Sequence, residues 1–258
     1  MQEKVQIKNK KGLLLSAVIE RPDDTGKYPT VLFLHGFKGY KEEATYTDLA
    51  QRFLEHGIAS VCFDASGFGD SEGTLEDDYR FSNYIDDTEA VFTWLLKQDF
   101  ADTNKLGVVG QSMGGAQTIL FASNHPELKI AISISPPDKI GTDDALGAVK
   151  DQWKNMGYLQ EMSSRYGKEI KIPYVYLEDA MQYDFAKLAA NVQCPLVVVL
   201  GEKDDIVLPT QTERVFNAAK EPKILLRFEN MDHFYKRDKK VLNEVGRKIT
   251  NIIVEYLH

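Results

Sequence analysis

The chain has 258 residues, of which 43% are hydrophobic and 27% charged, so it is long enough for one large core and has an ordinary globular composition. Its 39 acidic and 31 basic residues give a formal net charge of −8. This balance argues against nucleic acid and anionic lipid as partners, because both require basic patches, and no apolar run approaches the roughly 20 residues that span a bilayer.

The N-terminal segment and the cysteines point to a reducing compartment. Residues 1–11 carry four lysines with no apolar stretch behind them, which is not the pattern of a secretory signal. Cys62 and Cys194 each lie in or beside an apolar run, so we expect buried thiols rather than a disulfide or a metal site. The five histidines lack the spacing of metal ligands. We therefore expect a cytoplasmic protein without a metal.

The first half of the chain alternates between strand-like and helix-like segments. Two short strand-like pieces, Val5–Ile7 and Leu13–Ile19, precede four apolar runs typical of strands buried on both faces: Val31–Leu34, Ala59–Phe63, Leu106–Val109 and Ile130–Ile134. Helix-like segments separate these runs: Thr47–His56, Asn83–Lys97 and Met113–Ser123. The alternation predicts an α/β protein with a mostly parallel central sheet flanked by helices.

The rhythm changes after Pro137. From Asp138 to about Asp184 the alternation breaks down, and glycines and aromatic residues become frequent. Regular alternation then resumes with a strand, a helix, a strand and a closing helix: Leu196–Leu200, Thr210–Lys220, Ile224–Phe228 and Asp238–Tyr256. We therefore expect a core domain of residues 1–136 and 185–258, with residues 137–184 inserted as a lid.

A glycine-rich turn follows the run Leu106–Val109 and precedes a helix-like segment. From Gly110 to Gly115 it reads G-Q-S-M-G-G, which contains G-x-S-x-G in the strand–turn–helix context of a nucleophile elbow. The serine of such an elbow has a strained backbone, and its glycine neighbours permit close approach. A bare match also occurs by chance in glycine turns, but this placement favours Ser112 as a nucleophile.

A serine nucleophile needs a base, and histidine is the natural choice because its pKa lies near 6.5. Four of the five histidines are poorly placed, since two precede the elbow, one follows it by only a helix length and one ends the chain: His35, His56, His125 and His258. His233 remains, in a loop directly after Ile224–Phe228. An isolated loop histidine is usually a surface residue, but this position favours His233 as the base.

The imidazole in turn needs a carboxylate to hold its tautomer. Asp204 and Asp205 follow Leu196–Leu200, at the sheet edge where functional sites of open α/β sheets lie. Adjacent aspartates are also common in solvated turns, and only one of the two can point at His233. The oxyanion of a tetrahedral intermediate requires pre-aimed N–H donors, of which the backbone of Met113 is one candidate.

Together these features resemble the α/β-hydrolase fold, with the chain order Ser, Asp, His. Four motifs carry the resemblance: His35-Gly36-Phe37, Asp64–Ser71, the elbow at Ser112, and Gly201…Asp204…Val207-Leu208-Pro209 followed by His233. The resemblance implies Asp204 as the acid, because the family commonly has it at G-x-x-D before V-x-P, although Asp205 replaces the small residue or proline often found next. It also implies the N–H of Phe37 as the second oxyanion donor and a structural role for His35.

The single insertion is similar to the lid of bacterial carboxylesterases and cinnamoyl (feruloyl) esterases. That resemblance implies a lid over the acyl pocket whose polar side chains contact phenolic hydroxyls, a role for which Asp144 and Gln152 are candidates. The aromatic residues of the insertion, Trp153 among them, either stack on an aromatic acyl group or form a lid core without substrate contact.

We therefore expect a serine hydrolase that cleaves carboxylic esters through an acyl-enzyme, with Ser112, His233 and Asp204 as its catalytic residues. A peptidase or thioesterase on the same scaffold is the alternative, and a non-catalytic binding protein is a third interpretation. The expected partner is a small-molecule ester. No cofactor is expected, because no G-x-G-x-x-G leads from a strand into a helix. The oligomeric state is open, a homodimer included.

Overall fold

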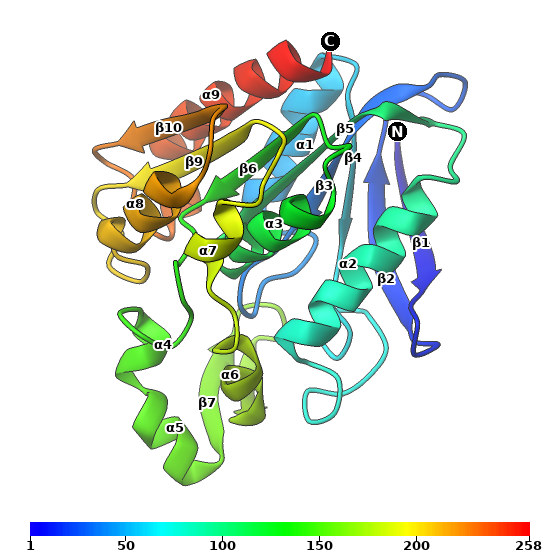
Figure 1. The fold of residues 1–258 in the computed structure, drawn as a ribbon. Helices are drawn as coiled ribbons and strands as arrows, with labels where there is room; N and C mark the ends of the chain where they lie inside the picture. The colour runs from blue at the N-terminus through cyan, green and yellow to red at the C-terminus, as the bar shows by residue number, and fades with distance from the viewer.

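A computed structural model describes residues 1–258, in which a central eight-stranded sheet has the order β1-β2-β4-β3-β5-β6-β9-β10 (Figure 1). The antiparallel β1–β2 hairpin joins β4 in antiparallel fashion, and every other pair in this sheet is parallel. The strands are β1 (Gln2–Lys8), β2 (Leu14–Glu20), β3 (Tyr28–Leu34), β4 (Ala59–Phe63), β5 (Ala101–Gln111), β6 (Ile130–Ile134), β9 (Leu196–Gly201) and β10 (Lys223–Phe228). The expected mostly parallel sheet is confirmed.

Helices cover both faces of this sheet, and each face has its own apolar core. On one face lie α1 (Ala44–Glu55) and α9 (Lys239–Leu257), whose apolar stripes pack on side chains such as Val31 and Phe33. The other face carries α2 (Phe81–Leu95), α3 (Met113–Asn124) and α8 (Pro209–Ala218). The central strands are buried on both sides, which explains their near-continuous apolar sequences.

Residues between β6 and β9 form a separate layer over one end of the sheet (Figure 1). This lid contains short helices and an antiparallel hairpin of its own: α4 (Ala145–Ala148), α5 (Lys150–Met156), β7 (Tyr158–Ser163), β8 (Lys168–Pro173) and α6 (Val175–Ala180). The following α7 (Phe185–Ala189) packs against α3 and α8. At the hairpin turn, Arg165 pairs with Asp70 of the loop after β4 and thereby ties the lid to the core.

Several elements begin earlier than the apolar pattern predicts. β5 begins at Ala101 instead of Leu106. The apolar pattern does not include residues 102–105, because they are polar and partly exposed. Helix α1 begins at Ala44 instead of Thr47, after the charged residues that precede it. Cys62 and Cys194 are buried free thiols, as expected. None of the helices combines the length and the apolar character needed to cross a membrane.

Candidate active site

Ser112 lies at the point where β5 turns directly into α3. Its backbone has φ 59° and ψ −119°, in the left-handed region that residues with a Cβ rarely adopt. A Cβ on Gly114 would lie 1.9 Å from the carbonyl oxygen of Leu34, and one on Gly110 would lie 2.2 Å from that of Gly114. The two glycines therefore permit the tight packing of strand, turn and helix that presents the Ser112 side chain.

The structure brings Ser112, His233 and Asp204 together. The Oγ of Ser112 lies 3.0 Å from Nε2 of His233, and Nδ1 of His233 lies 2.8 Å from Oδ2 of Asp204. Because a carboxylate can only accept, Nδ1 carries the proton, and Nε2 is left to accept from the serine hydroxyl. The Asp204 side chain is 1% exposed and also accepts the N–H groups of Ile206 and Val207, whereas Asp205 is exposed.

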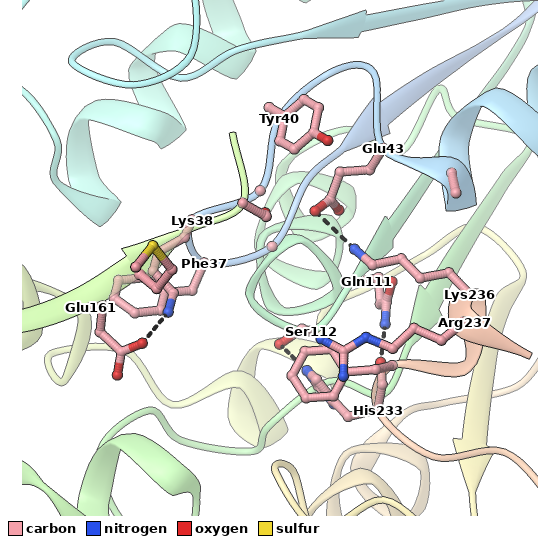
Figure 2. Close-up of a pocket in the computed structure, with 16 residues that line it drawn as sticks. Phe37, Lys38, Tyr40, Glu43, Gln111, Ser112, Glu161, His233, Lys236 and Arg237 are labelled. Carbon is pink, nitrogen blue, oxygen red and sulfur yellow. Dashed lines mark hydrogen bonds and ion pairs between the residues drawn. The ribbon is translucent and has the colours of Figure 1, made fainter. Parts of the chain in front are cut away.

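The loop that carries His233 is held by Gln111, the residue before the nucleophile. The Nε2 amide of Gln111 donates to the carbonyl oxygen of His233 at 2.8 Å (Figure 2). Sequence reasoning missed this residue, although it occupies the first variable position of the G-x-S-x-G pattern. Gln111 therefore couples the elbow to the histidine loop.

The loop after β3 lies against the nucleophile. A Cβ on Gly36 would be 3.4 Å from Cβ of Ser112 and 4.0 Å from its Oγ. The N–H groups of Phe37 and Met113 donate to no other group of the protein. Met113 is the first residue of α3, and Phe37 follows Gly36, which lies against Ser112, so both N–H groups are available to an anion formed there.

His35 fixes this loop from within. Its Nδ1 donates to the carbonyl of Gly36 at 2.9 Å, and its Nε2 accepts the N–H of Ala65 at 3.1 Å. Burial lowers the pKa of His35, so the ring is neutral, as the Nε2 acceptor role requires. On the other side of Phe37, the N–H of Lys38 donates to the hydroxyl of Tyr79 at 2.8 Å.

Two pockets open on either side of Ser112, and His233, Phe37, Lys38, Glu161 and Phe234 line both of them. One pocket, with a volume of about 610 Å³, is polar (Figure 2). The other, of about 370 Å³, is largely apolar, and its remaining lining includes Pro137, Ile140, Leu146, Val149, Ile206 and Val207.

Two ion pairs cross the polar pocket. Nζ of Lys38 lies 2.6 Å from Glu161 of the lid hairpin, and Nζ of Lys236 lies 2.8 Å from Glu43 (Figure 2). The first pair joins the loop after β3 to β7 and so separates the two pockets at the lid. Sequence reasoning missed both pairs, because their partners are far apart in the chain.

The lid residues proposed as substrate contacts are placed differently from expectation. Asp144 lines the apolar pocket, but its carboxylate caps α4 by accepting the N–H groups of Gly141 and Gly147 at 2.9 and 2.8 Å, and burial raises its pKa. Gln152 is exposed and lines neither pocket, so the substrate-contact prediction is wrong for it.

Trp153 matches the second of the two roles expected for the lid aromatics, a lid core without substrate contact. Its ring is fully buried, and Nε1 donates to the carbonyl of Ile172 at 2.9 Å. The face of α5 that carries Trp153 turns inward against β8, where the ring packs near Phe37 and Tyr176. Trp153 therefore belongs to the lid core.

No group of three or more His, Cys, Asp or Glu side chains is arranged to hold a metal ion.

The sequence was compared with family models and with known proteins. Residues 11–148 match the model of the X-Pro dipeptidyl-peptidase (S15) family, a match that includes Ser112 but ends before Asp204 and His233. An uncharacterised 31.7 kDa protein from the traX-finO intergenic region of Escherichia coli is 25% identical over 232 residues, covering 76% of this chain and 80% of that protein.

Two solved structures share the fold over almost their whole length. Est1E from Butyrivibrio proteoclasticus, determined with bound ferulic acid, has a TM-score of 0.78 and 21% identity, covering 98% of both chains. The α/β hydrolase GrgF from Penicillium sp. sh18 has a TM-score of 0.81 and 18% identity, covering 100% of this chain and 99% of the other. The expected α/β-hydrolase fold is thus confirmed. Because the family match spans more than half of the sequence, the chain is a hydrolytic enzyme that belongs to the X-Pro dipeptidyl-peptidase (S15) family.

Proposed function

We propose that the protein hydrolyses carboxylic esters through an acyl-enzyme formed on Ser112. The observation that carries the proposal is the continuous chain of hydrogen bonds from Ser112 Oγ to His233 at 3.0 Å and from His233 to Asp204 at 2.8 Å. This arrangement supplies a nucleophile, a base in the required tautomer, and a carboxylate that stabilises the imidazolium.

In the proposed reaction, Ser112 Oγ attacks the ester carbonyl while Nε2 of His233 takes the hydroxyl proton. The negative charge that develops on the carbonyl oxygen is bound by the N–H groups of Phe37 and Met113. His233 then returns its proton to the departing alcohol. Water repeats the sequence on the acyl-enzyme and releases the acid, with Asp204 holding the charged imidazole in both halves.

The apolar pocket supports an ester with one hydrophobic side. Its volume of about 370 Å³ and its aliphatic lining suit an alkanoyl or arylalkenoyl group. The likeness to Est1E, determined with ferulic acid, makes methyl ferulate the first aromatic ester to test beside alkanoyl esters.

Peptide hydrolysis is the second candidate, and the family match favours it. Release of an N-terminal dipeptide requires a group that recognises the substrate's free ammonium. The two glutamates that line the polar pocket, Glu43 and Glu161, are each already paired with a lysine. This pairing favours an ester over a peptide with a free N-terminus.

Substitution of Ser112 by alanine tests the proposal. We expect Ser112→Ala to lower the kcat for 4-nitrophenyl butyrate by about 10³-fold or more, since the covalent route is lost. Ser164→Ala is the matched control, because Ser164 lines the polar pocket without a hydrogen bond to the histidine. Retention of activity in purified, folded Ser112→Ala protein would remove Ser112 from the mechanism.

A comparison of bond types decides between the two candidates. We expect kcat/KM to be higher for a hexanoyl ester than for the matching thioester or for an X-Pro 4-nitroanilide. A clear preference for the anilide would favour the peptidase. Absence of labelling of Ser112 by a fluorophosphonate, together with no turnover of any substrate, would indicate a binding protein instead.

A further inference from the structure

Arg237 extends a cationic side chain over the polar pocket. It ends the short 3₁₀ helix η1 (Tyr235–Arg237), four residues after His233, and it is one of the residues that line this pocket. Its guanidinium carbon lies 4.4 Å from the ring centroid of Phe234. Phe234 itself borders both pockets. The aromatic ring therefore supports the guanidinium beside the nucleophile.

The positive charge of Arg237 is not compensated by the protein. Five charged side chains line the polar pocket, and four of them form the two ion pairs Lys38–Glu161 and Lys236–Glu43. Arg237 takes part in neither a salt bridge nor a side-chain hydrogen bond, so its five N–H donors are free. The pocket thus has an excess of one positive charge in a chain whose net charge is −8.

The two pockets differ in the kind of group that they suit. The apolar pocket favours a hydrocarbon group, whereas the polar pocket, with its planar guanidinium, suits a carboxylate that can accept two parallel N–H donors. Both pockets meet at Ser112 and His233, so one substrate can occupy both while its ester carbon lies at the nucleophile.

We infer that the preferred substrates are esters that carry a carboxylate on one side of the scissile bond, with Arg237 as the residue that selects it. The inference rests on the proposed ester hydrolysis and names the substrate class for that same site. Because Arg237 is exposed, its ion pair with a substrate carboxylate adds specificity and favours the approach of anions more than it adds affinity.

Two matched ester pairs test the inference. The first is 4-nitrophenyl hydrogen adipate against 4-nitrophenyl hexanoate, which places the carboxylate on the acyl side. The second is 3-carboxyphenyl butanoate against phenyl butanoate, which places it on the alcohol side. For each pair the measured quantity is the ratio of kcat/KM for the charged ester to that for the neutral ester, in wild type and variants.

In at least one pair, we expect Arg237→Gln to lower this ratio by about fivefold, the upper range for an ion pair at an exposed site. Arg237→Glu should lower it further, and Arg237→Lys should keep part of it. The control Lys239→Gln removes the same charge two residues further along, from an exposed side chain outside the pocket, and should leave the ratio unchanged. Added salt should lower the wild-type ratio.

Ratios that stay unchanged in both pairs on Arg237→Gln and Arg237→Glu would overturn the inference while the neutral esters are still hydrolysed. An equal loss on Lys239→Gln would also overturn it, because the effect would then come from net charge rather than from the pocket. If wild-type protein hydrolyses none of the four esters, the proposed function fails, and this inference fails with it.

Discussion

At the scale of single residues, the choice between Asp204 and Asp205 can be tested without disturbing the loop that carries them. Oδ1 of Asp204 accepts the N–H groups of Ile206 and Val207 at 3.1 and 2.9 Å, and the amide oxygen of an asparagine can do the same. Its amide nitrogen, however, would donate to His233 and leave the proton on the wrong ring nitrogen. We expect Asp204→Asn to lower kcat for 4-nitrophenyl butyrate by about 10³- to 10⁴-fold.

Asp205→Asn is the matched control, because it makes the same chemical change on an exposed neighbour. Its kcat should stay close to wild type, and the thermal midpoints of both variants should differ little from the wild-type value. An equal loss of kcat in both variants would contradict the assignment of Asp204.

The residue scale also separates what sequence can predict from what it cannot. Ser112 and His233 could be proposed because their chemistry restricts the residue type and because each follows a strand, whereas only the family resemblance favoured Asp204 over Asp205. Gln111 and Arg237 could not, since their roles depend on contacts that only the folded chain creates.

The roles of single lid residues could not be predicted from the sequence for the same physical reason. Trp153 and Gln152 are adjacent on α5, one fully buried and the other exposed, and a helix this short has no apolar stripe to indicate which face turns inward. Asp144 is a candidate for substrate contact by resemblance because its side chain is polar, but the structure uses its carboxylate to cap α4.

At the scale of elements, the packing of α3 against β3 depends on a glycine without unusual backbone angles. A Cβ at Gly114 would lie 1.9 Å from the carbonyl oxygen of Leu34, a backbone atom at the end of a central strand that cannot move away cheaply. We expect Gly114→Ala to lower the free energy of unfolding by about 3 kcal/mol or more, measured by urea denaturation.

Gly57→Ala provides the contrast, since Gly57 has φ +69° but nothing within 4 Å of the added Cβ. Its cost should be only the backbone strain of about 1 kcal/mol. If the two variants lost similar stability, close packing at the elbow would not be the reason for glycine at position 114.

Elements of the core could be predicted well and those of the lid could not. The runs Ala59–Phe63 and Ile130–Ile134 match β4 and β6 residue for residue, because strands buried on both faces are apolar throughout. The hairpin of β7 and β8 is partly exposed and carries charged residues on both strands, so its sequence has no such signature. The insertion could therefore be located from the change in rhythm, but its internal structure could not.

At the scale of the whole molecule, two histidines lie near opposite ends of α3, with His233 beside Ser112 and His125 directly after the last turn. Ser112 precedes the helix and His125 follows it, about 18 Å away for a helix of 12 residues. Nε2 of His125 lies 3.0 Å from Glu89 of α2, and Nδ1 lies 2.8 Å from Glu127. The ring also packs against Phe92 and Phe121, so this contact joins α2 to the end of α3.

This contact predicts a pH dependence of stability. Burial alone would lower the pKa of His125, but its hydrogen bonds to Glu89 and Glu127 outweigh burial and raise the pKa above 6.5. A raised pKa in the folded state means that the protonated ring stabilises the fold fully below the unfolded pKa of about 6.5. That stabilisation is lost as the pH rises through the higher pKa of the folded state.

The difference between wild type and His125→Gln isolates this contribution, which matters because burial lowers the pKa of His35 and so gives the opposite trend. We expect urea denaturation to show a larger stability gap between the two proteins at pH 6 than at pH 8.5. His56→Gln is the control for the loss of a histidine as such, because His56 is exposed and its side chain has no carboxylate partner. A gap for His125→Gln that is constant across this range would show that the ring stabilises the helix end by packing on Phe92 and Phe121 and not by its charge.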